Sequence, residues 1–175
     1  MTRRRPGWKR PPALGVDVGG VIVQLAGRDE DTSFFGTRPL ETPVVDGAVA
    51  ALAELTAGAF AGRVHLISKA GPKVAANTRA WLAHTDFFRR TGIDDDNVHF
   101  VRERRDKAPV CERLGITHFV DDHLAVLAHL DAVDHRHLFL GGTHDRDVGE
   151  VPEWATVTFD WADLTALLTR GPAAP

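Results

Sequence analysis

Side chains with the chemistry of phosphate transfer stand at four separate points of the sequence. Asp17, Ser68 and the pair Asp121-Asp122 each end an apolar run, and Lys107 opens a helical pattern. A carboxylate can attack phosphorus and form an acyl-phosphate. Carboxylate oxygens also hold Mg²⁺, while a hydroxyl and an ammonium group stabilise charge on a phosphoryl group. These residue types together predict phosphoryl-transfer chemistry with Mg²⁺ as the cofactor.

Glycines and a lysine next to two of these points fit the same chemistry. Gly19 and Gly20 follow Asp17, and Lys69 follows Ser68. Glycines let the backbone approach a phosphate closely and donate N–H groups to it. Lys69 is a candidate to face the same anion, whereas Lys73 is interpreted as a surface lysine.

The elements that must position these residues are short β-rich runs that alternate with helical patterns. Strands are expected at residues 13–18 with a continuation at 21–23, and at 64–68, 98–101, 117–121, 137–140 and 155–159. Helices are expected from an Asp46 N-cap to near Gly58, from Pro72, at about 106–114, after the fourth strand through Leu130, and after an Asp160 N-cap. This alternation predicts an α/β fold, a parallel sheet with helices on both faces. In such a sheet, ligands bind beyond the carboxyl ends of the strands.

Length and composition fit one soluble domain. The chain has 175 residues, 43% of them hydrophobic, and a formal net charge of -3. We expect a basic flexible tail at 1–12, a single domain at 13–170 and a second tail at 171–175. The small net charge gives no reason to expect nucleic acid as a partner, although the basic tail leaves open an arm that contacts a polyanion.

Cys111 is the sole cysteine, which excludes an internal disulfide and favours a reducing compartment. It lies in a helical pattern and is interpreted as a buried, inert thiol. No apolar run is long enough to span a bilayer, and no secretion signal is expected. We therefore expect a cytoplasmic protein without a membrane partner, and the sequence leaves open a homo-oligomer.

Taken in order, these points resemble the motifs of the haloacid dehalogenase (HAD) superfamily. The run Leu14-Gly15-Val16-Asp17-Val18-Gly19-Gly20-Val21-Ile22 resembles its first motif, an apolar strand followed by Asp-x-Asp-Gly-Val/Thr. Leu66-Ile67-Ser68 resembles the second motif, Lys107 the third, and His118-Phe119-Val120-Asp121-Asp122 the fourth. The resemblance covers about residues 14–140 and implies a three-layer, Rossmann-like fold.

The same resemblance implies a role for each matching residue. Asp17 would be the nucleophile and a metal ligand, and the Gly19 carbonyl a further ligand. Ser68 and Lys107 would hold the phosphate. Asp121 and Asp122 would divide direct and water-mediated metal contacts, in an order that the sequence leaves open.

A narrower likeness points to the 5'(3')-deoxyribonucleotidase branch. It rests on Pro43-Val44-Val45-Asp46-Gly47-Ala48 before the second motif and on Arg105-Asp106-Lys107. The family often inserts a cap domain between the first two motifs, but residues 26–43 are too few for a full helical cap. We expect a capless or minimal-cap member, whose substrate is a phosphorylated small molecule or a larger phosphorylated substrate.

Gly19 is the main departure from the family pattern. HAD phosphatases usually have an Asp there that protonates the leaving group and then activates water, and a glycine does neither. A phosphomonoesterase with slow turnover is one reading. The alternatives are a hydrolase for another bond, such as carbon–halogen, and an inactive domain that binds a phosphate ligand or a protein.

Histidines and paired phenylalanines are secondary candidates. A histidine zinc site at His135 and His137 is not favoured, because no other ligand is close in sequence. His123 and His144 should lie near strand ends, and His123 is a candidate substitute base. Phe34-Phe35 and Phe87-Phe88 are expected to pack under loops, with Phe34-Phe35 alternatively meeting a substrate ring.

Overall fold

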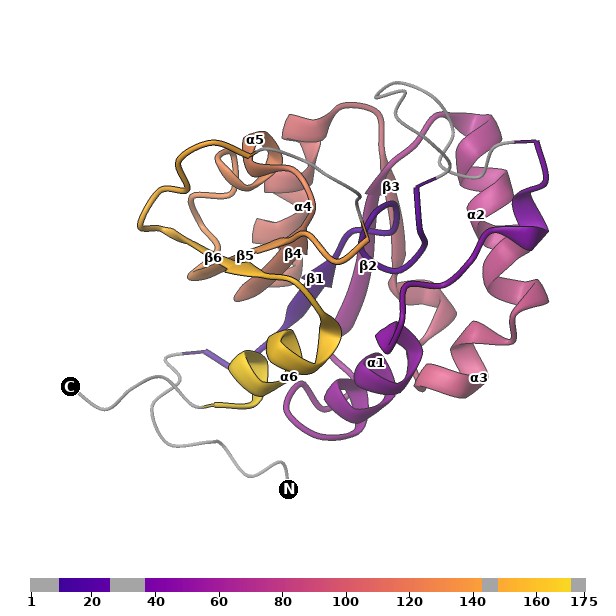
Figure 1. The fold of residues 1–175 in the computed structure, drawn as a ribbon, viewed down its shortest axis with the longest axis horizontal. Helices are drawn as coiled ribbons and strands as arrows, with labels where there is room; N and C mark the ends of the chain where they lie inside the picture. Colours follow the sequence, from indigo (N-terminus) through magenta and orange to yellow (C-terminus); the bar gives the residue numbers. More distant parts are fainter. Residues whose placement is uncertain (1–9, 26–36, 143–147, 171–175) are drawn as a thin grey trace.

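A six-stranded parallel sheet forms the centre of the molecule (Figure 1). The computed structural model describes residues 10–25, 37–142 and 148–170. The strand order is β3-β2-β1-β4-β5-β6, with every pair parallel. The strands are β1 (Leu14–Val16), β2 (Val64–Lys69), β3 (Val98–Val101), β4 (His118–Asp121), β5 (His135–Phe139) and β6 (Ala155–Thr158). This is the doubly wound order in which ligands bind where the connections diverge, here between β1 and β4.

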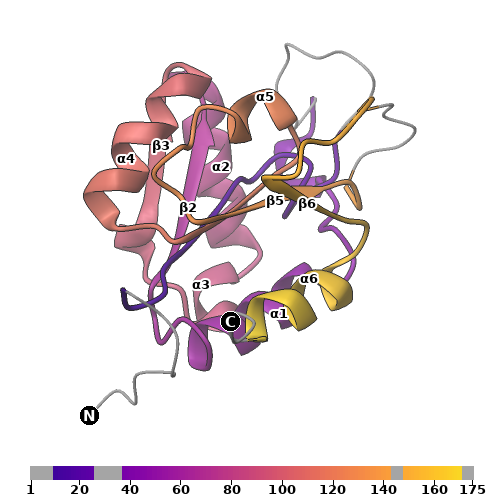
Figure 2. The same cartoon turned by 90° about the vertical axis from the view of Figure 1, so that its left-hand side faces the viewer.

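Helices cover both faces of the sheet (Figure 2). Four of them pack on one face with the larger hydrophobic cluster: α1 (Ala48–Ala57), α2 (Pro72–His84), α3 (Phe87–Thr91) and α6 (Trp161–Thr169). The other face carries α4 (Lys107–Leu114) and α5 (Leu124–Leu127) over a second cluster. Three short 3₁₀ turns complete the elements: η1 (Pro39–Glu41), η2 (Asp95–Asn97) and η3 (Arg104–Asp106). The expected three-layer α/β fold is therefore confirmed.

Most of the expected elements are present, with bounds that differ by a few residues. The strand predicted at 98–101 is β3, and Asp160 caps α6 by accepting a hydrogen bond from the Asp163 amide at 2.8 Å. Residues 21–23 do not extend β1. The chain turns back there, and the amides of Ile22 and Val23 donate to the Val18 carbonyl at 2.9 and 3.1 Å.

Three helix predictions need correction. The N-cap of α1 is Gly47 in a left-handed conformation, with φ of 80°, and not Asp46. The helix expected through Leu130 ends at Leu127, because tighter turns take over before β5 begins. Phe87, expected under a loop, instead lies in α3, a helix that the sequence did not predict, and is fully buried in the larger cluster.

The division into a domain and two tails stays a prediction. Residues 1–9 and 171–175 lie outside the described part of the chain. Arg10, the last basic residue of the expected first tail, forms an ion pair with Asp134 at 3.0 Å. The described helices include none that is long and apolar enough to cross a membrane.

Candidate active site

Asp17 and Asp121 come together at the switch point of the sheet, where one lysine bonds both carboxylates. β1 and β4 are neighbours in register, with Val16 beside Val120. Asp17 follows β1 directly, and its amide donates to the Val120 carbonyl at 2.9 Å. Asp121 is the last residue of β4 and is fully buried. Both carboxylates therefore lie at the carboxyl edge of the sheet, where the sequence predicts them.

Lys107 joins these two carboxylates. Its Nζ donates to Asp17 Oδ1 at 2.9 Å and to Asp121 Oδ2 at 2.8 Å. The lysine begins α4, and its side chain is only 2% exposed, with Nζ 5.4 Å from the centre of the Phe119 ring. Lys107 is therefore a buried, paired residue, although it lies in the first turn of a helix.

In this trio, burial and the attraction between opposite charges shift the pKa values of the side chains in opposite directions. Burial alone would lower the pKa of Lys107, but Asp121 and Asp17 outweigh it and raise that pKa above its ordinary value. Burial raises the pKa of Asp17 and of Asp121, although Lys107 acts to lower both. A neighbouring carboxylate adds to each rise: Asp121 raises the pKa of Asp17, and Asp122 raises the pKa of Asp121. The site thus holds more carboxylates than cations.

A tight loop after β1 brings Gly19 and Gly20 next to the carboxylates. Gly20 donates its N–H to the Val23 carbonyl at 2.8 Å and has φ of 75°, in the left-handed region that favours glycine. A Cβ on Gly20 would overlap the carboxylate of Asp122. The loop therefore requires glycine both for its backbone conformation and for its contact with Asp122.

Two further contacts hold this loop in place from the α6 side of the sheet. Trp161, the first residue of α6, donates its Nε1–H to the Val21 carbonyl at 2.9 Å. Gly142, after β5, lies so close to the Gly20 carbonyl that a Cβ would overlap it. The loop is positioned by residues far away in sequence, so its geometry does not depend on Asp17 alone.

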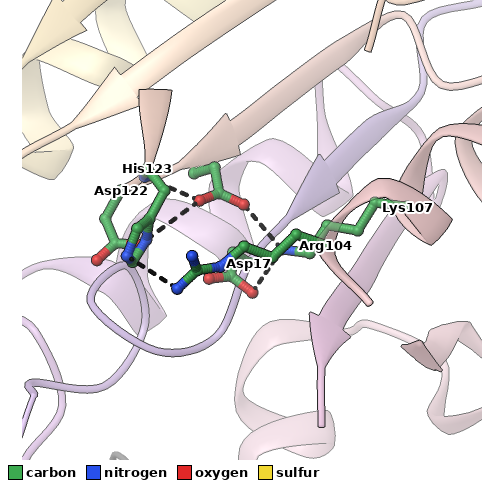
Figure 3. Close-up of polar contacts among 6 residues, drawn as sticks. Asp17, Arg104, Lys107, Asp122 and His123 are labelled. Carbon is green, nitrogen blue, oxygen red and sulfur yellow. Dashed lines mark hydrogen bonds and ion pairs between the residues drawn. The ribbon is translucent and has the colours of Figure 1, made fainter. Parts of the chain in front are cut away.

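His123 is partly exposed and Arg104 is exposed, and their side chains approach one another next to Asp122 and the end of β4 (Figure 3). His123 Nδ1 is 2.7 Å from Asp122 Oδ1, and its backbone amide donates to Asp121 Oδ1 at 2.9 Å. Arg104 Nη2 is 3.5 Å from His123 Nε2. The position expected for His123 near a strand end is correct. Arg104 was missed, because a run of arginines on a turn looks like an ordinary solvated surface in sequence.

The residues at this edge fit a hard divalent cation. Asp121, Asp122 and His123 each offer a ligand atom within 4.8 Å of the others. The carboxylates of Asp17, Asp121 and Asp122 are buried, and Lys107 forms ion pairs with the first two of them. Buried carboxylates are costly without cations, and carboxylate oxygens are the ligands that Mg²⁺ takes. The donor set therefore suits Mg²⁺.

Ser68 and Lys69, the other expected phosphate ligands, end the neighbouring strand. Ser68 is buried at 2% exposure near the carboxyl end of β2, beside Phe100 of β3. Lys69 is exposed. Within the described residues, neither has a recorded hydrogen bond to the Asp17–Lys107–Asp121 trio, so their phosphate-binding role stays a prediction.

The remaining candidates fall outside this arrangement. Cys111 is buried in α4, and burial raises the pKa of its thiol to about 12, in agreement with an inert cysteine. His118, the first residue of β4, stacks against His135 and His137 of β5, but the metal-ligand geometry found in the described residues does not include these histidines. His144 and Phe34-Phe35 lie outside the described residues, as do residues 26–36 of the expected flap.

Comparison with known proteins supports the fold. No protein-family model matches the chain, and no curated protein matches it. Among solved structures, a "putative HAD-like phosphatase" from Mesorhizobium loti is similar, with a TM-score of 0.54 and 14% sequence identity. The match covers 94% of this chain and 88% of that one. The chain therefore has the three-layer α/β fold of an HAD-like phosphatase structure.

Proposed function

We propose that this protein is a Mg²⁺-dependent phosphomonoesterase that works through an aspartyl-phosphate on Asp17. One observation carries the proposal: the Lys107 ammonium group lies between the carboxylates of Asp17 and Asp121 at the switch point of the sheet. Asp17 provides a nucleophile, and Lys107 provides a fixed cation beside it. The motif order and the HAD-like fold support the same reading.

Mg²⁺, when bound, would neutralise charge on the phosphoryl group and on the carboxylates around it. Its proposed ligands are Asp17, the Gly19 carbonyl and Asp122. Asp121 is the less suitable direct ligand, because Lys107 and the His123 amide already occupy its two oxygens. Asp121 would then fix Lys107 and contact the metal through water.

In the first step, an Asp17 oxygen forms a bond to phosphorus while the bond from phosphorus to the ester oxygen breaks. The departing oxygen takes a proton from water, since Gly19 has no side chain to supply one. Lys107 stabilises negative charge on the phosphoryl oxygens, and Ser68, Lys69 and the amides of Gly19 and Gly20 are the proposed further donors.

In the second step, water attacks the acyl-phosphate, releases inorganic phosphate and restores the Asp17 carboxylate. General acid–base catalysis is typically worth about 10²–10⁴-fold. Without an Asp at position 19 we expect both steps to be slow, and the hydrolysis of the acyl-phosphate to limit turnover.

The substrate is proposed to be a phosphorylated small molecule or a larger phosphorylated substrate, with nucleoside monophosphates as the first class to test. The nucleotidase reading rests on the Pro43–Ala48 run and on Arg105-Asp106-Lys107. Cytoplasmic location, suggested by the sole cysteine, belongs to the same proposal.

Gly19 also favours a second candidate, a domain that binds a phosphate ligand or a protein without turning anything over. A panel of phosphomonoesters with Mg²⁺ separates the two, assayed on the native chain, Asp17→Asn and Gly19→Asp. A phosphomonoesterase releases phosphate in the native form, loses it in Asp17→Asn and gains rate in Gly19→Asp. Mg²⁺ binding without turnover in all three proteins would favour the second candidate.

A further inference from the structure

Arg104 presents an exposed guanidinium group at the candidate site, where it points toward His123 (Figure 3). It is exposed, and its recorded polar partner within the described residues is His123 Nε2 at 3.5 Å. No ion pair to a carboxylate is recorded for it in that part of the chain. A guanidinium has five donors, so most of its donor capacity remains for a ligand.

The backbone places Arg104 and Lys107 on one tight turn. η3 spans Arg104–Asp106 and leads directly into α4 at Lys107, whose amide donates to the Arg104 and Arg105 carbonyls. Asp106 closes this turn by accepting a hydrogen bond from the Glu103 amide at 3.1 Å. The turn thus carries two cations: Lys107 is buried against Asp17, and Arg104, three residues earlier, is exposed.

His123 provides the side-chain contact of the Arg104 guanidinium group. An ionised carboxylate only accepts hydrogen bonds, so the His123 nitrogen that faces Asp122, Nδ1, is assigned the proton. A guanidinium N–H only donates, so Nε2 is assigned as the acceptor in its contact with Arg104. This contact leaves the Arg104 guanidinium without a carboxylate partner among the described residues.

The charge balance of the site indicates which kind of group Arg104 would bind. Asp17, Asp121 and Asp122 bring three negative charges and Lys107 one positive charge. A bound divalent cation would balance the remaining two, and a phosphoryl dianion would then add two more. Lys107 is buried and is occupied by the carboxylates, so an anionic group farther out on the substrate would meet Arg104 first.

We propose that Arg104 binds a second anionic group of the substrate, which makes the preferred substrate a phosphomonoester that also carries a carboxylate or a second phosphate. This inference rests on the function proposed above. It concerns the part of the substrate that is not transferred, since the transferred phosphoryl group meets Lys107 and Asp17. Arg104 therefore determines specificity and does not take part in bond breaking.

Matched esters test this inference. 3-Phosphoglycerate and glycerol 3-phosphate differ by a carboxylate, and glucose 1,6-bisphosphate and glucose 6-phosphate differ by a phosphate. We expect the native protein to favour the doubly anionic member of at least one pair by roughly tenfold or more in kcat/KM, mainly through KM, since hydrogen bonds between charged groups are strong. The pair that shows the preference identifies the second anion.

Arg104→Gln should abolish that preference. Arg105→Gln is the matched control, because it removes the same charge from the next residue, whose exposed side chain forms no hydrogen bond or ion pair with the other described residues. It should retain the preference. A preference that persists in Arg104→Gln, or that is lost equally in Arg105→Gln, would overturn the inference.

Binding provides a second readout that does not need turnover. The affinities of 3-phosphoglycerate and glycerol 3-phosphate are measured by calorimetry with Mg²⁺ on Asp17→Asn and on Asp17→Asn/Arg104→Gln. Tighter binding of 3-phosphoglycerate that disappears in the double variant supports Arg104 even if no ester is hydrolysed. If the native protein hydrolyses the esters of each pair equally well, the proposed function stands and the role of Arg104 is wrong. If no ester is hydrolysed and none binds, both fail.

Discussion

The ammonium group of Lys107 lies 2.9 Å from the carboxylate of Asp17, a residue 90 positions earlier in the chain. The same ammonium group bonds Asp121 at 2.8 Å, so one lysine compensates two buried carboxylates. Such an arrangement is costly to bury, and breaking one side of it leaves uncompensated charge inside the protein. The trio therefore matters for stability as well as for the proposed chemistry.

Replacing Lys107 with Met should destabilise the fold and abolish phosphatase activity. Breaking a buried ion pair typically costs about 3–5 kcal/mol, because the remaining charges stay in the interior. The free energy of unfolding in urea measures the loss. Lys73→Met is the control, since Lys73 is exposed in α2 and such surface changes stay within about 0.5 kcal/mol. Equal stability of the two variants would show that Lys107 is not paired as described.

Gly20→Ala should weaken Mg²⁺ binding in addition to straining the backbone. A left-handed φ costs a residue with a Cβ about 1–2 kcal/mol, and this Cβ would also displace the Asp122 carboxylate. Gly62→Ala separates the two effects, because Gly62 has φ of 78° and open space around its Cβ position. Both variants should lose stability, but Gly20→Ala alone should lose the rise in unfolding temperature on adding Mg²⁺. A full Mg²⁺ response in Gly20→Ala would argue against a metal held beside this loop.

Asp122→Asn should remove most of the Mg²⁺ response while leaving the Lys107 ion pairs in place. A ligand that binds the native state alone raises stability by an amount that increases with its affinity and concentration, so the unfolding temperature with and without Mg²⁺ reports the site. Asp131→Asn serves as the control, because the Asp131 side chain is 91% exposed. If Asp122→Asn responds to Mg²⁺ as the native protein does, Asp122 is not a direct ligand.

Acid should destabilise the protein through its buried histidines. Burial first, and neighbouring histidines second, lower the pKa of His118 to about 2 and that of His137 to about 4, from an ordinary value of 6.5. The unfolded chain binds protons below pH 6.5 while the folded protein does not, so the free energy of unfolding falls as the pH drops from there. For His137 the fall continues to about pH 4.

His137→Leu tests this dependence. His137 is buried, and neither ring nitrogen has a hydrogen-bond partner in the described structure, so leucine should fit at little cost. Between about pH 6.5 and pH 4, the free energy of unfolding of the variant should depend less steeply on pH than that of the native protein. The difference in slope should be up to about 1.4 kcal/mol per pH unit. Urea unfolding over that range measures the slope. Parallel curves for native and variant would mean that His137 is protonated in the folded state as well.

The sequence is informative about elements whose pattern is local. β3 follows directly from Val98-His99-Phe100-Val101, and the Asp160 cap from an Asp placed before an apolar helix. Asp46 as an N-cap was wrong, because the chain needs a left-handed residue there and Gly47 supplies it. α3 was missed, since five residues show too little periodicity to reveal a helix.

The candidate site shows the same division. Asp17 and Asp121 were chosen as polar residues that end apolar strands and Lys107 as the opening residue of a helix, and the structure brings the three together. The sequence could not reveal that Lys107 is buried, because this depends on the pairing of β1 with β4. The approach of Arg104 to His123 depends in the same way on two loops that meet only in the folded chain.

Trapping the covalent intermediate tests the central claim most directly. The native protein is mixed with Mg²⁺ and p-nitrophenyl phosphate, quenched in acid and examined by intact-protein and peptide mass spectrometry. Because Gly19 cannot activate water, the proposed mechanism predicts that the acyl-phosphate accumulates, with the mass of one phosphoryl group on Asp17 that hydroxylamine removes. Asp17→Asn should carry none. Phosphate release by the native protein with no label on Asp17, or with the label on another residue, would contradict the mechanism.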